Sequence, residues 1–166
     1  MKEFLIAPND GWGIAARLLL ALFLGGVIGW NRQKLRQAAG LRTHMLVSLG
    51  AAIFVLLPLQ IGGSAGLDGM GRAVQGVATG VGFLGAGEIL QVRRGQRARV
   101  TGLASAASLW VTAALGMVAG CGLWMLGLMA AGLTLLTLGG MKWLEDISSD
   151  TFYGNDGNDG NRDDRS

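Results

Sequence analysis

Two ionisable side chains, Arg17 and Glu88, lie inside long apolar stretches of this sequence. A charge at the middle of a bilayer-spanning helix costs about 2.5 to 3.5 kcal/mol, so such residues either reach toward the interface or serve a function. Glu88 is therefore interpreted either as a carboxylate that extends to the nearest interface or as a ligand for a cation or proton inside a helical bundle. Arg17 presents the same choice. We do not expect the two to pair, because they fall toward opposite membrane faces.

Three further polar residues stand where apolar stretches begin. Asp68 and Arg72 are four residues apart, which favours a charge at a helix N-terminus with a weak i,i+4 pair. Asp68 is also a candidate, with Glu88, for a weak Mg²⁺ site, because Mg²⁺ is bound through one or two carboxylates and keeps several waters. His44, the one histidine, either donates to backbone carbonyls or senses pH. No nucleophile with a base, zinc spacing or phosphate loop occurs, so we expect neither an enzyme nor a bound cofactor.

Five apolar segments of about 20 residues determine the fold class. A hydrocarbon core about 30 Å thick needs roughly 20 residues of helix, and helices satisfy their backbone groups without water. The sequence therefore predicts an all-α, polytopic transmembrane bundle over residues 1–144 and a disordered acidic tail over 145–166. The expected spans are 12–30, 43–61, 72–92, 101–119 and 123–143.

The distribution of charge predicts an orientation. Residues 1–144 carry twelve basic and four acidic side chains, whereas 145–166 carry two and seven. The basic residues concentrate in two short loops, 31–42 and 93–100, and such loops are cytoplasmic in membrane proteins. We therefore expect the N-terminus outside and the C-terminus in the cytoplasm, and no binding of nucleic acid despite a pI near 9.6.

Glycine is unusually frequent, at 29 of 166 residues, against an average near 7%. Three pairs have the four-residue spacing that lets two helix backbones approach closely. They predict tight packing within one chain or across a homodimer; the alternative is a path for ions along thin helices. The small hydroxyl residues of the fourth segment favour helix packing in the same way. The glycine pairs are Gly25 and Gly29, Gly76 and Gly80, and Gly116 and Gly120; the hydroxyl residues are Thr101, Ser105, Ser108 and Thr112.

Three blocks of sequence resemble the N-terminal membrane domain of the MgtC/SapB family. They are residues 39–52, which contain Arg42, Thr43 and His44; residues 76–87, just after Arg72; and residues 102–116, which contain Trp110. The resemblance extends over about residues 13–143. It implies a bacterial inner-membrane protein with about five spans. The soluble C-terminal domain that many members carry is not part of the match.

The resemblance implies two alternative functions. Family members are associated with growth at low magnesium, so the chain is expected to be a magnesium-homeostasis protein that regulates another membrane protein, such as ATP synthase. The alternative is a transporter or channel for magnesium or another cation. This sequence departs from the family pattern at three positions: Asn31 and Gly69 stand where acidic residues are usual, and Glu88 stands where an apolar residue is usual.

Overall fold

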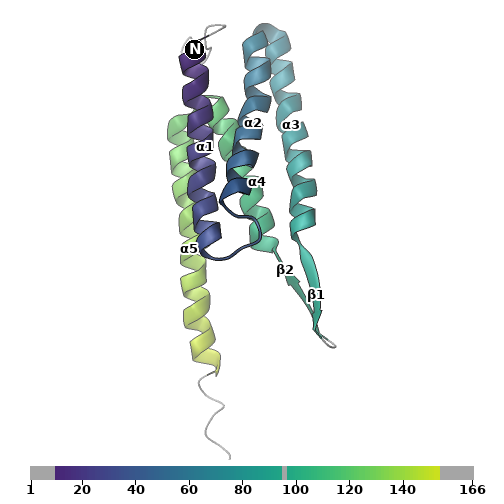
Figure 1. Ribbon diagram of the computed structural model, residues 1–166, viewed down its shortest axis with the longest axis vertical. Coiled ribbons are helices and arrows are strands. Elements are labelled where there is room, and N and C mark those ends of the chain that lie inside the picture. Colours follow the sequence, from purple (N-terminus) through teal and green to yellow (C-terminus); the bar gives the residue numbers. More distant parts are fainter. Residues whose placement is uncertain (1–9, 95–96, 154–166) are drawn as a thin grey trace, which may run out of the picture.

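The described part of the chain folds into five long α-helices and one pair of short antiparallel β-strands (Figure 1). The structure is a computed structural model that describes residues 10–94 and 97–153. The elements, in chain order, are α1 (Gly11–Lys34), α2 (Leu41–Ile61), α3 (Gly63–Glu88), β1 (Leu90–Arg94), β2 (Arg97–Thr101), α4 (Leu103–Gly120) and α5 (Trp124–Tyr153). The predicted all-α bundle is confirmed in this architecture.

Three of the helices are long and apolar enough to cross a membrane. They are α1, α2 and α4, and α5 adds a shorter apolar stretch at Trp124–Gly140. The α3 helix interrupts its apolar residues with many glycines and with Asp68, Arg72 and Glu88. Large apolar side chains cover the outside of the bundle, among them Phe23, Leu46 and Phe83. Exposed apolar side chains around long apolar helices are typical of a protein surrounded by lipid.

Helix α2 lies at the centre of the packing together with α4, which contacts all four of the other described helices. Helix α2 contacts α1, α3 and α4, whereas α3 and α5 form opposite edges of the bundle (Figure 1). The helices alternate in direction, so the start of α1 and the end of α5 lie at opposite ends. The α1–α2 connection and the hairpin lie at the same end as the C-terminal part of α5. This arrangement gathers the arginine-bearing connections at one end of the bundle.

Glycines of α1 and α4 bring both helices into backbone contact with α2. A Cβ atom on Gly25 would lie 2.6 Å from the His44 carbonyl oxygen, and one on Gly29 would lie 2.8 Å from the Leu41 Cα atom. From the other side, a Cβ on Gly116 would collide with the Ser48 carbonyl group. Gly120 faces Ala52 in the same way. The missing side chains are therefore what allows this close packing.

The third glycine pair is placed differently. A Cβ on Gly76 or on Gly80 would meet no other atom within 4 Å. Both residues instead line an apolar groove of about 940 Å³ between α2 and α3. The spacing alone indicated a contact face, and within the described residues that face is left open.

The α3 helix has other bounds than the expected span of 72–92. It begins at Gly63, so the segment predicted as a glycine-rich turn, 62–71, is helical except for Gly62, whose φ is +71°. A Cβ on Gly66 would lie 2.7 Å from the Pro58 carbonyl oxygen, so the first turns of α3 run close against the end of α2. In a lipid environment a helix satisfies these backbone groups better than an open turn does.

At its other end α3 gives way to a hairpin. The chain leaves the helix at Glu88, and β1 pairs antiparallel with β2 from Leu90–Thr101 to Arg94–Arg97. The sequence predicted helix to residue 92 and an irregular loop over 93–100. Alternating polar and β-branched residues favour strands here. Gly102 (φ +92°) then turns the chain into α4, close to the Glu88 carbonyl.

The first and last helices are longer than the expected spans. Helix α1 continues past Trp30 to Lys34, and α5 continues past Trp143 to Tyr153. The beginning of the segment predicted as a disordered tail, 145–153, is therefore helical. The rest of that segment, 154–166, lies outside the described residues.

The glycine contacts predict a difference between two single substitutions. Gly116→Ala should lower the free energy of unfolding by about 1 to 3 kcal/mol, because the added methyl group has no space against α2. Gly76→Ala should be neutral or slightly stabilising, because alanine favours helix and the site is open. Unfolding of each variant in mixed detergent micelles, followed by circular dichroism, measures both. Equal stability of the two variants would contradict the packing.

Candidate functional site

A cluster of buried polar side chains lies where α1, α2 and α4 meet, near the α1–α2 connection. Its members are Arg32 of α1, His44 of α2, and Ser105 and Ser108 of α4, and each is at most 3% exposed. Buried polar groups are stable only when they are hydrogen-bonded. The cluster is therefore a defined network rather than a set of surface charges.

Arg32 extends from the last turns of α1 to α4. Its Nη2 donates to Ser105 Oγ over 3.0 Å, and Ser105 Oγ donates to Gln37 Oε1 over 3.3 Å. The Nε atom of Arg32 has no hydrogen-bond partner among the described residues. A buried cation that keeps an unused donor is a candidate to bind an anionic or carbonyl group.

His44 joins α2 to the same face of α4. Its Nδ1 lies 2.8 Å from the Gly40 carbonyl oxygen, and because a carbonyl only accepts, Nδ1 carries the proton. Its Nε2 lies 3.1 Å from Ser108 Oγ, which also lies 2.7 Å from the Ser105 carbonyl oxygen. With Nδ1 protonated, Nε2 of the neutral ring is an acceptor. The Ser108 hydroxyl therefore has two alternative acceptors, the Ser105 carbonyl oxygen and His44 Nε2.

Glu88 lies beside this cluster, but its hydrogen bond goes to the α1–α2 connection. It is half-buried at the end of α3, and its Oε1 accepts a hydrogen bond from the Ala39 backbone N–H over 3.1 Å. The carboxylate thereby ties α3 to the α1–α2 connection.

The other predicted candidates lie elsewhere. Asp68 is exposed on α3 and is about 30 Å from Glu88 along the helix, at 1.5 Å per residue. The two carboxylates therefore do not share one site. Within residues 10–94 and 97–153 no group of three His, Cys, Asp or Glu side chains could hold a metal ion. Arg72 and Trp110 are exposed, and so are Arg42 and Thr43, the neighbours of His44.

Arg17 lies at the opposite end of the bundle from Glu88, as expected. Its Nη1 donates to the Gly120 carbonyl oxygen over 2.9 Å, at the C-terminus of α4. This contact satisfies one of the carbonyls that a helix end leaves unpaired and places a cation at the negative end of the helix dipole.

The sequence reasoning missed Arg32 as a buried residue and assigned it to a basic loop. The signal was present in two spacings. Arg32 follows Gly29 by one helical turn, on the face that approaches α2. Ser105, Ser108 and Thr112 are three and four residues apart, on one face of α4. A glycine face with a charge one turn later, opposite a face of hydroxyl residues, indicates a buried polar contact between helices.

These features define a class: a small polytopic membrane protein, held together by glycine faces, with one buried basic cluster at the end of the bundle that carries the arginine-bearing connections. The model of the MgtC family matches residues 18–147. The chain belongs to the MgtC family.

Several curated relatives are similar to the chain over much of its length. SrpB of Synechococcus elongatus is 51% identical over 155 residues, which cover 89% of this chain and 85% of that protein. The Escherichia coli (strain K12) protein named "Putative magnesium transporter YhiD" is 42% identical and covers 74% of this chain. MgtC of Salmonella typhimurium is 43% identical and covers 63% of it.

The fraction of each relative's length that the chain covers differs between the relatives. The chain spans 57% of YhiD and 42% of MgtC, so each has a further part that this chain does not match. No solved structure matches the chain.

The Arg32–Ser105 contact predicts a measurable coupling. Ser105→Ala should lower the free energy of unfolding by about 1.5 to 3 kcal/mol, because it leaves a buried guanidinium without its acceptor. In an Arg32→Met background the same change should cost much less, because no charge remains to be satisfied. A double-mutant cycle in detergent unfolding measures this coupling. Independent, additive effects would contradict the contact.

Cys121, in the turn between α4 and α5, offers a test at the other end of the bundle. Burial raises the pKa of the Cys121 thiol, and the nearby Arg17 guanidinium opposes that shift. A raised pKa means less thiolate at neutral pH, so alkylation of Cys121 should be slow at pH 7. Its rate should increase at a higher pH than the alkylation rate of a free cysteine does. Arg17→Gln should move the profile further upward. The alkylation rate against pH measures both, and a profile at or below that of a free cysteine would contradict them.

Proposed function

We propose that this protein serves magnesium homeostasis in the bacterial inner membrane by binding and regulating another membrane protein. The observation that carries the proposal is the open glycine face of α3. Gly76 and Gly80 border the groove between α2 and α3, and a Cβ on either would meet no described atom within 4 Å, whereas the glycine pairs of α1 and α4 lie against α2. An open glycine face in lipid accommodates a second helix at close range.

The lining of this groove supports a helical partner. Its lining is apolar along its length and includes Phe54 and Leu57 of α2 and Val77 and Leu84 of α3, and its charged lining residue is Arg72. A transmembrane helix with small or aliphatic residues fits such a surface. ATP synthase, which the family resemblance implies as a partner, could supply such a helix; a second copy of this chain, giving a homodimer, is the other candidate occupant.

The link to magnesium rests on the relatives. The name of YhiD describes magnesium transport, and MgtC of Salmonella typhimurium gives the family its name. Regulation is favoured over transport because the centre of the bundle is filled by backbone contacts between α1, α2 and α4. The carboxylates that would serve an ion path, Asp68 and Glu88, lie at opposite ends of an edge helix.

Filling the groove should separate regulation from transport. Gly80→Leu should abolish growth at low magnesium in a strain that depends on this protein, because the leucine occupies the partner's place. Gly132→Leu is the matched control, since it also meets no other atom within 4 Å but lies on α5 outside the groove. The growth yield of each strain at limiting magnesium is the measurement.

The transport alternative is tested by magnesium flux into vesicles that contain the purified chain. Regulation predicts no magnesium flux above that of empty vesicles. It also predicts that a strain with a folded Glu88→Gln variant grows normally at low magnesium. Flux that falls on Glu88→Gln would favour the transporter and would contradict regulation as the main activity.

A further inference from the structure

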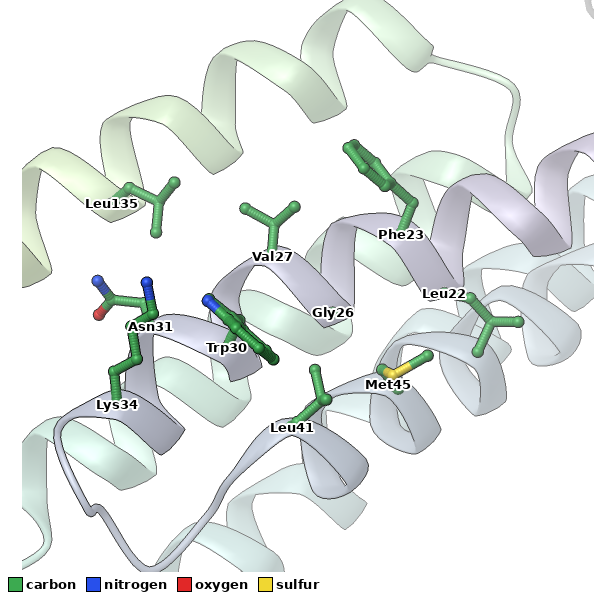
Figure 2. A pocket seen from close by; sticks show the side chains of 10 residues that line it. All are labelled: Leu22, Phe23, Gly26, Val27, Trp30, Asn31, Lys34, Leu41, Met45 and Leu135. Atoms are coloured by element: carbon green, nitrogen blue, oxygen red, sulfur yellow. The ribbon is translucent and has the colours of Figure 1, made fainter.

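A second groove, between α1, α2 and α5, is apolar over most of its lining, which includes Leu41 and Leu135, and carries Asn31 and Lys34 at one end (Figure 2). Its volume is about 600 Å³. Leu22, Phe23 and Val27 of α1 line the inner part, with Met45 of α2. Trp30, Asn31 and Lys34 line the outer end. This order of surfaces is that of a phospholipid, with acyl chains inside and a headgroup outside.

The length of the groove matches one leaflet of a bilayer. Phe23 and Lys34 are eleven residues apart on one helix, which corresponds to about 17 Å at 1.5 Å per residue. Half of a hydrocarbon core about 30 Å thick is roughly 15 Å. A lipid whose phosphate lies beside Lys34 would therefore extend its acyl chain to the level of Phe23.

The outer end carries a positive charge at the depth of the interface. The Lys34 ammonium lies 5.5 Å from the centroid of the Trp30 ring, and tryptophan is characteristic of the membrane interface. Lys34 is exposed, and within the described part of the chain it forms no ion pair with an acidic side chain. Arg36, two residues later, is exposed as well. The exposed cations Lys34 and Arg36 favour a headgroup with net negative charge over a zwitterionic one.

We propose that this groove is a binding site for one anionic phospholipid, with its phosphate at Lys34 and an acyl chain along Phe23, Val27 and Met45. Gly26 gives the acyl chain its space. A Cβ there would meet Met45 and Leu41 at 3.7 to 3.9 Å, an ordinary contact distance, so a larger residue fits the fold but fills the groove. The site is separate from the α2–α3 groove of the proposed function and does not depend on it.

The test is native mass spectrometry of the full chain released from nanodiscs of phosphatidylcholine with increasing phosphatidylglycerol. The wild type should retain one phosphatidylglycerol in preference to phosphatidylcholine, and salt should weaken the retention. Lys34→Gln should weaken the apparent affinity about fivefold, and Lys34→Arg should preserve it. Gly26→Leu should remove the bound lipid although it leaves every charge in place.

Two control variants separate this site from general effects. Arg72→Gln removes the exposed cation of the α2–α3 groove, and Gly82→Leu adds a side chain that belongs to neither groove, where no described atom lies within 4 Å. Both should retain the lipid as the wild type does. Circular dichroism melting shows whether each variant is folded. The Lys34 variants test the charge at the groove, and the Gly26 variant tests its space independently. Equal retention of both lipids by the wild type, or wild-type retention by both Lys34→Gln and Gly26→Leu, would overturn the proposal.

Discussion

The structure depends on the backbone contacts that α2 makes with α1 and α4. Among lipid tails, apolar side chains gain little by facing one another, so association of helices relies on close packing and hydrogen bonds. Gly25 and Gly29 provide the approach on one side of α2, and Gly116 and Gly120 provide it on the other. Ser48 lies between the two faces, fully buried, and its hydroxyl donates to the Ala21 carbonyl oxygen over 2.7 Å. A side chain on either face would separate the helices.

The buried polar cluster follows from this packing. Arg32 lies one turn beyond Gly29, and His44 is the residue whose carbonyl Gly25 approaches. Because α1 and α4 both lie against α2, Arg32 of one reaches Ser105 of the other. In contrast, the two edges of the bundle contact fewer helices, and both leave grooves open to lipid. The same constraint thus produces a closed centre with a buried hydrogen-bonded network, and open grooves at the flanks.

The sequence was sufficient for the helical class and the number of helices, because apolar length and backbone satisfaction leave few alternatives in a bilayer. It was less informative at helix ends. Residues 63–71 are rich in glycine and indicated a turn, but their contact with α2 keeps them helical. The spacing of glycine pairs did not distinguish occupied faces from open ones, since Gly76 has the same pattern as Gly116. The burial of Arg32 is indicated only by two spacings taken together, its place one turn after Gly29 and the row of hydroxyl residues on α4, and neither spacing indicates it alone.

The contact between Gly116 and Ser48 tests this account most directly. A Cβ on Gly116 would lie 2.7 Å from the Ser48 carbonyl carbon, and the Cα–Cβ bond adds about 1.5 Å. The Gly116 Cα atom should therefore lie within about 4.2 Å of that carbonyl carbon. Solid-state NMR of the full chain in lipid bilayers, with ¹³C-labelled glycine and serine, measures this distance by dipolar recoupling. A cross peak at short mixing time is the predicted result. Its absence, with a separation beyond about 7 Å, would contradict the central role of the glycine contacts.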